Sequence, residues 1–345
     1  MVAIAPKDNY VDLLLENDIE FIELKKLARK GTNPINDLLL VNELRKIYKR
    51  NNLDAVLQYT IKPNIYGTLA ASLSNTKTIC TVTGLGYTFL NKNLTSKIAH
   101  QLYRFAFKKA DKILFQNTDD LQTFLDFNLA EKSKCGIIHG SGIDVEKFHP
   151  DFCRTIENNK SENTRFLMIG RLLKDKGIFE YIEAAQLVKQ QFPKTKFHVL
   201  GEIDTQNPSA IKKEELENWI KNDIIIYHEH AKDTRPFICN ADCVVLPSYR
   251  EGMPRVILEG MAMGKPCVTS DAPGCKDSII DGESGFLCKT ADSQSLANAM
   301  QTFILLNNDA KIEVGKQARK RAEIIFSSIY INDKYLMLIQ NLAKI

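Results

Sequence analysis

The segment that decides the fold is residues 246–263, LPSYREGMPRVILEGMAM. Residues 241–246, in which only Asp242 is polar, predict a buried parallel strand, which a Pro-Ser pair ends. Pro254 stands where a helix would begin, because the first helical position tolerates a missing N–H. We therefore expect a strand, a turn that contains Glu251, and a helix that contains Glu259 eight positions later.

The N-terminus of this helix is a candidate anion site. Its free amides carry about half a unit of positive charge and attract phosphate. Carboxylates beside a phosphate suit hydroxyl groups joined to it, and this combination indicates a nucleotide-sugar. The alternative interpretation is that both glutamates are solvated helix-surface residues, as most glutamates are.

The whole segment resembles the donor-site signature of retaining glycosyltransferases of family 4, also called group 1. The residues that carry the resemblance are Glu251-x7-Glu259, with Pro-Ser at 247–248 before them and Gly-Lys-Pro at 264–266 after them. The resemblance implies an α/β fold of the GT-B type, with two Rossmann-like domains facing across a cleft. It also implies that the backbone after the first glutamate binds the donor: Gly252, Met253 and Pro254.

A second loop carries the expected positive charge. Residues 165–169 predict a strand and residues 178–191 a helix, with Gly170, Arg171 and Lys176 between them. Arginine grips phosphate through two N–H groups, and lysine acts as a point charge. Basic loop residues are usually only solvated, but the order glycine, arginine, lysine matches the family. The resemblance implies that both cations act in catalysis by neutralising the donor diphosphate, with Gly170 at the donor.

Catalysis should depend on charge that develops as a nucleoside diphosphate departs, because preorganised charge is the largest usual source of acceleration. The resemblance implies that Glu251 holds hydroxyls of the transferred sugar near its anomeric carbon and that Glu259 holds ribose hydroxyls. A strand at residues 196–200 ends at Gly201, where the family approaches the nucleotide. No Asp-x-Asp occurs in the sequence, so we expect neither a divalent cation nor a cofactor besides the UDP-sugar donor.

The cysteines and clustered histidines do not form a metal motif. The eight cysteines are scattered without a C-x-x-C pair, and Cys239 and Cys243 have no second pair at zinc-finger spacing. His228 and His230 flank a glutamate without a third ligand nearby, which favours a nucleotide-base pocket or an ordinary loop. Reduced thiols in the cytosol are the default expectation.

Alternating strands and helices in residues 1–150 predict a first doubly wound parallel sheet. Such a domain normally opens with a central strand, a Gly-rich turn and a helix. This chain begins with residues 2–5, which resemble the family's second strand. We expect the N-terminal domain to lack its first strand and helix, through a downstream start or a truncation.

Four residues of the first half are candidates for the acceptor side of the cleft. Gly84 and Gly86 follow a strand, and T-G-L-G resembles a cleft loop in the subgroup that uses polyprenyl-diphosphate-linked sugars, although a tight turn is the alternative. His139 ends a strand that faces the expected cleft. Lys62 follows the third strand, where many relatives carry a cleft histidine, and could contact a diphosphate.

Charge is uneven along the chain. Residues 1–150 hold 20 Lys and Arg against 16 Asp and Glu, whereas the rest is balanced. This excess fits an anionic membrane surface or a phosphorylated acceptor, and no nucleic-acid motif occurs. A basic helix at residues 91–112 could lie on a membrane or pack on the core with a solvated basic face. Its expected apolar stripe is Leu94, Ile98, Leu102, Phe105 and Ala106.

We expect an N-terminal acceptor-side domain at 1–150, a linker at 151–164, a nucleotide-sugar domain at 165–325 and a C-terminal helix at 326–345 that packs back on the first domain. The expected activity is metal-independent, retaining transfer of a hexose or N-acetylhexosamine from a UDP-sugar to a lipid-linked saccharide, in surface-polysaccharide or glycan biosynthesis. The expected location is cytoplasmic, peripheral on the inner face of the cytoplasmic membrane. A nucleotide-sugar epimerase of the same fold and a truncated donor-binding remnant are the alternatives.

Overall fold

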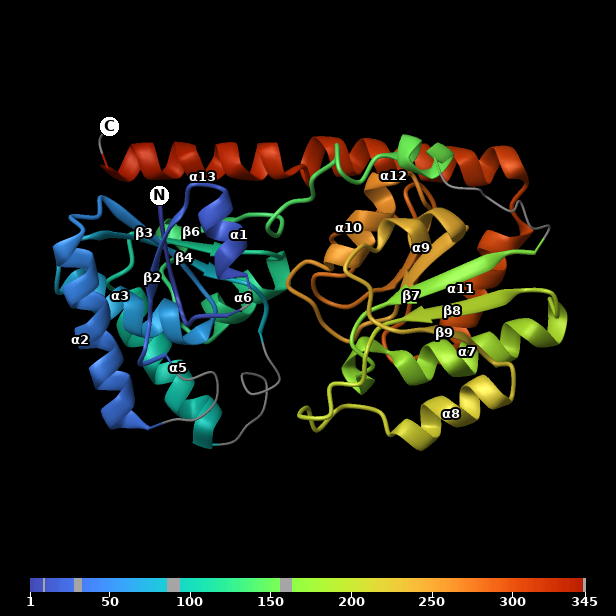
Figure 1. Cartoon of the computed structure of the whole chain (residues 1–345), viewed down its shortest axis with the longest axis horizontal. Helices are drawn as coiled ribbons and strands as arrows, with labels where there is room; N and C mark the ends of the chain where they lie inside the picture. Colours follow the sequence, from blue (N-terminus) through green and yellow to red (C-terminus); the bar gives the residue numbers. More distant parts are fainter. Residues whose placement is uncertain (9, 28–32, 86–93, 156–162, 344–345) are drawn as a thin grey trace. The chain divides into compact units, whose positions relative to one another are not determined.

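The computed structural model describes residues 1–8, 10–27, 33–85, 94–155 and 163–343 (Figure 1). The chain separates into two compact units, and the short segment Gln116–Asp120 belongs with the C-terminal half. Residues 138–150 also belong there, although the sequence suggested a division at residue 150. Unit 1 comprises Met1–Phe115, Leu121–Ile137 and Leu336–Ile345, and unit 2 comprises Gln116–Asp120 and Ile138–Tyr335. Half of the expected linker, residues 156–162, lies outside the described residues.

Unit 1 contains two parallel sheets, one of four strands in the order β3-β4-β5-β6 and one of the two strands β1-β2. Within the described residues, β1 pairs only with β2, and β3 pairs only with β4. The described strands of unit 1 thus form two separate sheets. The elements are β1 (Val2–Ala5), α1 (Val11–Glu16), β2 (Glu20–Glu23), α2 (Pro34–Arg50), β3 (Ala55–Tyr59), η1 (Pro63–Gly67), α3 (Thr68–Ser72), β4 (Lys77–Val82), α5 (Leu94–Phe107), β5 (Lys112–Phe115), α6 (Thr118–Asp126), η2 (Lys132–Lys134) and β6 (Cys135–Ile137).

Two helices of unit 1 show how local sequence sets their limits. Asn33 caps α2, because its side chain accepts hydrogen bonds from the amides of Ile35 at 3.0 Å and Asn36 at 3.4 Å. Helix α5 ends at Phe107, five residues earlier than expected, because Lys112 already belongs to strand β5. Its buried face carries Tyr103 and Phe107, which pack against α6.

Unit 2 contains a six-stranded parallel sheet in the order β12-β11-β10-β7-β8-β9. From β7 the chain moves outward through β8 to β9, then returns to the other side of β7 and moves outward again through β10 to β12. The carboxyl ends of β7 and β10 therefore flank the point where the strand order reverses. The elements are η3 (Pro150–Thr155), β7 (Arg165–Ile169), η4 (Lys174–Lys176), α7 (Ile178–Gln191), β8 (Lys196–Leu200), α8 (Lys213–Lys221), β9 (Ile226–His228), α9 (Arg235–Asn240), β10 (Cys243–Leu246), α10 (Arg255–Ala262), β11 (Cys267–Ser270), β12 (Phe286–Cys288), α11 (Ser293–Leu305), α12 (Asn308–Ile325) and α13 (Ser328–Ala343), which continues into unit 1.

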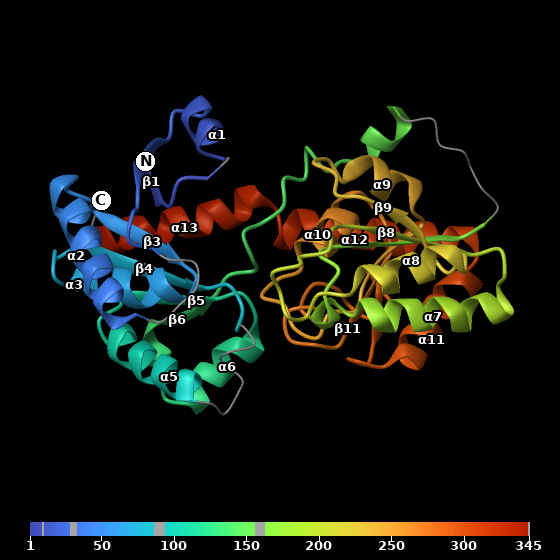
Figure 2. The same ribbon diagram turned by 60° about the horizontal axis from the view of Figure 1, so that its bottom comes forward.

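Helices cover both faces of this sheet. Figures 1 and 2 show α7 and α11 together on one face, and α9, α10 and α12 on the other. The strands β7, β10 and β11 are almost wholly buried, as expected of central parallel strands. This core fixes the positions at which the loops after β7 and β10 leave the sheet.

The expectation that all cysteines are reduced is wrong for one pair. Cys153 in η3 and Cys239 in α9 form a disulfide with a Cα–Cα distance of 5.1 Å. The sequence could not indicate this pair, because 86 positions separate the two cysteines and no motif relates them. Six further cysteines are free thiols, five of them buried.

None of the described helices combines the length and the apolar character that crossing a bilayer would require.

Candidate functional site

The reversal point of the sheet in unit 2 brings two predicted site residues into contact. Lys176 ends η4 in the connection after β7, and Glu251 lies in the turn after β10. The Lys176 ammonium donates to Glu251 Oε1, and their side chains are only 22% and 15% exposed. Ligands of parallel α/β sheets bind at such a reversal point, at the carboxyl ends of the strands. The contact therefore marks a candidate binding site.

A glycine next to the lysine lets these two loops approach each other. Gly177 has φ +76°, and a Cβ atom on it would lie 2.2 Å from the carbonyl oxygen of Pro247. Any side chain here would push the loop after β7 away from the loop after β10. The Lys176–Glu251 contact thus depends on backbone approach as well as on charge.

Arg171, the second predicted cation, has a different partner. Its guanidinium forms an ion pair with Asp204 at 2.9 Å, and its side chain is 51% exposed. Asp204 lies in the loop after β8, the strand next to β7. Exposed ion pairs contribute little stability, so the guanidinium can exchange this carboxylate for another anion at small cost.

Glu259 is buried inside α10, which excludes the interpretation that it is a solvated surface residue. Its carboxylate accepts a hydrogen bond from Thr234 Oγ1 at 2.9 Å and another from Arg255 Nε at 3.3 Å. Burial raises the pKa of the Glu259 carboxyl, and the hydrogen bonds only partly offset this effect. A carboxylate held this way favours additional hydroxyl donors.

The remaining donor-side residues lie on the same strand ends and loops. Gly170 follows β7 and Gly201 follows β8, and the amide of Gly170 donates to Leu200 O at 3.0 Å. Pro254 is the N-cap residue of α10, one position before the helix begins. Met253 packs against Gly140, on which a Cβ would lie 2.9 Å from the Met253 Cβ. The Gly252 carbonyl accepts from Asn117 Nδ2 at 3.0 Å.

The predicted acceptor residues are spread over both units. Gly84 follows β4 in unit 1, and Gly86 lies outside the described residues. The Lys62 ammonium is paired with the buried carboxylate of Asp37 at 3.1 Å, also in unit 1. His139 belongs to unit 2, where burial lowers the pKa of its imidazole and the Phe326 ring lies 5.8 Å away. Their acceptor roles remain predictions.

One histidine of the expected His228–His230 cluster has a histidine partner on the neighbouring strand. His198 on β8 and His228 on β9 stack with ring centroids 5.3 Å apart, and their Nδ1 and Nε2 atoms lie 3.0 Å apart. Burial lowers the pKa of His198 to about 4, with the His228 charge as a second cause. Among the described residues, no group of three or more His, Cys, Asp or Glu side chains could hold a metal ion.

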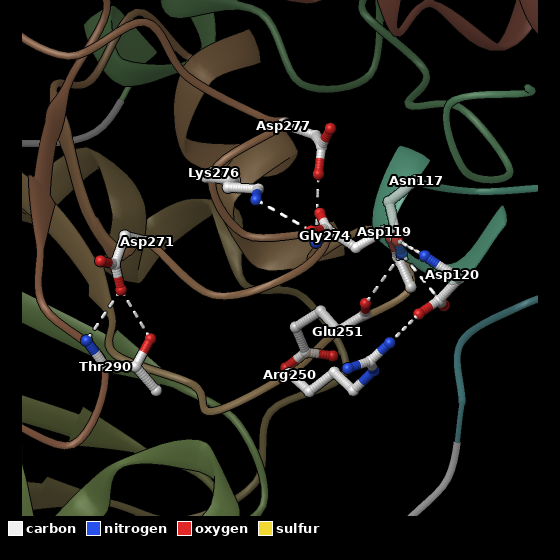
Figure 3. Close-up of polar contacts among 11 residues, drawn as sticks. Asn117, Asp119, Asp120, Arg250, Glu251, Asp271, Gly274, Lys276, Asp277 and Thr290 are labelled. Carbon is white, nitrogen blue, oxygen red and sulfur yellow. Dashed lines mark hydrogen bonds and ion pairs between the residues drawn. The ribbon is translucent and has the colours of Figure 1, made fainter. Parts of the chain in front are cut away.

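Sequence reasoning missed a polar cluster beside Glu251, which Figure 3 draws. Asn117 and Asp120 at the start of α6 are buried, and Asp120 forms an ion pair with Arg250. Asn117 donates to the backbone carbonyls of Glu251 and Gly252. Only one signal was present, namely an asparagine between strand β5 and helix α6, and it fits an ordinary helix cap equally well.

Comparison with protein families finds two matches that together span most of the chain. A family model described as "Glycosyl transferases group 1" matches residues 151–321, and one described as "Glycosyl transferase 4-like" matches residues 1–117. The first match contains every donor-side residue described above.

Among curated proteins, two similar relatives act on lipid-linked sugars according to their names. The N,N'-diacetylbacillosaminyl-diphospho-undecaprenol alpha-1,3-N-acetylgalactosaminyltransferase of Campylobacter jejuni is 29% identical over 356 residues, covering 99% of this chain and 91% of that protein. The UDP-Gal:alpha-D-GlcNAc-diphosphoundecaprenol alpha-1,3-galactosyltransferase of Escherichia coli is 26% identical over 274 residues, covering 77% of this chain and 70% of that protein.

Solved structures share the fold. A glycosyltransferase of Rickettsia africae superposes with a TM-score of 0.79 at 22% identity, covering 99% of this chain and 90% of that chain. Anabaena Alr3699/HepE, in complex with UDP and glucose, superposes with a TM-score of 0.81 at 19% identity, covering 98% and 91%. The GT-B fold expected from the sequence is confirmed.

Proposed function

This chain belongs to the group 1 glycosyltransferases, and from that premise we propose that it moves a hexose or N-acetylhexosamine from a UDP-sugar to a polyprenyl-diphosphate-linked saccharide. The reaction serves the assembly of a surface polysaccharide or glycan. It retains the anomeric configuration and needs no metal ion.

The observation that carries this proposal is the contact of Lys176 with Glu251 at the reversal point of the sheet. An ammonium at this position meets the diphosphate of a nucleotide that binds across the strand ends, and a carboxylate beside it accepts sugar hydroxyls. Departure of UDP builds negative charge on phosphate oxygens, and a cation that is already in place stabilises that charge without reorganisation. When the diphosphate attracts Lys176, Glu251 is released to accept hydrogen bonds from the transferred sugar.

The neighbouring loops supply the rest of the donor site. Arg171 joins Lys176 at the diphosphate by exchanging Asp204 for phosphate oxygens. Its planar guanidinium can donate hydrogen bonds to two of these oxygens at once. Glu259 accepts the ribose hydroxyls, because it is buried next to the same turn with two donors already fixing its orientation. The amides of Gly252 and Met253, which follow Glu251, donate to the diphosphate.

Support for a lipid-linked acceptor comes from the two relatives and from α5 in unit 1. The names of both relatives include a sugar linked to diphospho-undecaprenol. On α5, Leu94, Ile98 and Phe105 are exposed at 73%, 51% and 57%. Exposed Lys97 and Lys108 accompany them, whereas the expected stripe residue Ala106 is buried in the core. An exposed apolar and basic helix face suits peripheral binding to an anionic membrane.

The activity is tested with the purified chain, radiolabelled UDP-sugars and a synthetic polyprenyl-diphosphate-linked monosaccharide. We expect label to move from one or more of UDP-GalNAc, UDP-GlcNAc, UDP-Gal and UDP-Glc into the lipid, at the same rate with and without EDTA. The anomeric coupling in the product's NMR spectrum reports retention. Release of free sugar without any need for the lipid indicates the epimerase alternative, and UDP binding by calorimetry without turnover indicates the donor-binding remnant.

Membrane binding is tested separately, by sedimentation with phosphatidylglycerol vesicles and with phosphatidylcholine vesicles. We expect binding to the anionic vesicles only, and weaker binding when Ile98 and Phe105 are both replaced by serine. Equal binding to both vesicles, or no effect of the substitutions, contradicts the role of α5.

A further inference from the structure

The backbone of Glu251 and Gly252 is held by a buried side chain that no sequence motif singled out. Asn117 Nδ2 donates to Glu251 O at 3.2 Å and to Gly252 O at 3.0 Å (Figure 3). The same amide nitrogen lies 3.1 Å from Asp120 Oδ2, and Asn117 Oδ1 accepts from the Asp120 amide at 2.8 Å. Asn117 is 1% exposed, so water does not compete for these hydrogen bonds.

Two charged residues fix the orientation of Asn117. Asp120 is 0% exposed and forms an ion pair with Arg250, the residue that precedes Glu251. A buried carboxylate is stable only when it is paired and hydrogen-bonded. Arg250 and Asn117 together meet this need, and in doing so they bind the turn after β10 to the start of α6.

The other side of the same turn is closed by backbone. The Glu251 amide donates to Pro273 O at 3.0 Å. Gly274 has φ +79°, and a Cβ on it would lie 2.2 Å from Glu251 O and 2.6 Å from Gly252 O. The two carbonyl groups thus lie between the Gly274 backbone and the Asn117 amide.

The direction of these carbonyls decides the direction of two amides. In a trans peptide the C=O and the following N–H point in opposite directions. Since the carbonyls of Glu251 and Gly252 point to Asn117, the amides of Gly252 and Met253 point away from it. Those are the amides that the proposed function assigns to the donor diphosphate.

We propose that Asn117, held by Asp120 and Arg250, is a positioning residue that aims the Gly252 and Met253 amides at the departing diphosphate. This inference rests on the proposed function and adds residues from α6 to the donor site. Misplacement of a catalytic group by about 1 Å can lower a rate about 10²-fold. Loss of the Asn117 amide should therefore slow transfer although Asn117 does not touch the donor.

The test compares Asn117→Ala with Lys276→Ala as a matched control. Lys276, in the loop after β11, pairs with Asp119 at 3.0 Å and so also links residues 117–120 to a loop of unit 2, but through side chains that are 40% and 33% exposed. Transfer assays should show a kcat about 10- to 100-fold lower for Asn117→Ala, with a smaller change in donor KM, and nearly unchanged values for Lys276→Ala. Asn117→Asp should be slower still, because it sets a carboxylate against two carbonyl oxygens and Asp120.

A second readout does not depend on turnover. Hydrogen–deuterium exchange of a peptide covering residues 250–256 should slow on addition of saturating UDP in the wild type and in Lys276→Ala, but not in Asn117→Ala. If Asn117→Ala does not fold, as judged by thermal melting, Arg250→Lys takes its place and should show intermediate loss of both kcat and protection.

The outcomes separate the two proposals. If the wild type transfers sugar and the folded Asn117 variant retains kcat within threefold, the positioning inference is wrong and the proposed function stands. If the wild type transfers nothing, the proposed function fails, and the exchange experiment alone decides the inference: equal UDP protection in wild type and Asn117→Ala overturns it, and loss of protection in the variant supports it.

Discussion

Replacing Lys176 by methionine removes an ammonium from a contact that is mostly shielded from water. Glu251, whose side chain is 15% exposed, then loses its counter-charge. Removal of one partner costs about 3–5 kcal/mol in a buried ion pair and about 0–1 kcal/mol in an exposed one. With exposures of 22% and 15%, this pair lies between those limits. We expect the free energy of unfolding to fall by about 1–3 kcal/mol.

The double variant Lys176→Met/Glu251→Gln removes both charges and keeps side-chain volume. Its free energy of unfolding should return to within about 1 kcal/mol of the wild type, because no unpaired charge remains. Its transfer rate should not return. Loss of a preorganised group that stabilises transition-state charge costs about 10²–10³ in kcat, and the double variant still lacks that group.

Stability is measured by urea denaturation, and transfer by UDP release with saturating donor and acceptor. The expected pattern is a single Lys176 variant that is less stable and slow, and a double variant that is stable and slow. If the double variant regained both stability and rate, the pair would serve folding alone, and the assignment of Lys176 to the diphosphate would be refuted.

Three further predictions concern other groups of unit 2. Because burial lowers the pKa of His198 to about 4, the unfolded chain binds a proton below pH 6.5 that the native chain does not. The melting temperature should fall between pH 7 and pH 5, and less so in His198→Gln. Burial raises the pKa of Glu259, and ribose hydroxyls favour its charged form, so UDP binding near pH 5 should release a proton and weaken as pH falls. Calorimetry in two buffers of different ionisation enthalpy detects this release, which Glu259→Gln should abolish. Alkylation of the unfolded chain should modify six of eight cysteines without reductant and all eight with it, and reduction of Cys153–Cys239 should lower the free energy of unfolding by about 2–4 kcal/mol.

The second sheet could be predicted well because its strands are buried on both faces. Residues 165–169 and 196–200 are mostly apolar and are each followed by a glycine, and both are strands with the limits that the sequence suggested. The helix at 178–191 also has its expected limits, since Gly177 stands just before it in a left-handed conformation. A parallel strand covered by helices leaves this continuous apolar pattern, which local reasoning can detect.

Partner choice could not be predicted, because it depends on the packing of residues far apart in the sequence. Asn117 and Glu251 are 134 positions apart, and Lys176 and Glu251 are 75 apart. Nothing near Arg171 indicated that Asp204 would bind it. Local patterns specify which residues lie at the ends of strands, whereas the order of strands in the sheet specifies which of those ends are neighbours.

The strand order also explains why Lys176, after β7, and Glu251, after β10, lie in contact. The chain leaves β7 in one direction and β10 in the other, so the connections after these two neighbouring strands diverge and leave their backbone ends open. A cation after β7 can therefore pair with a carboxylate after β10, as Lys176 does with Glu251, or with a ligand that enters between them. In the proposed function, a bound diphosphate replaces the carboxylate as the partner of the lysine, and the released carboxylate turns to the sugar that the diphosphate carries. Under that proposal, one exchange of partners couples recognition of the leaving group to recognition of the transferred group. Because this coupling requires both charges, the neutral double variant should fold well and transfer slowly.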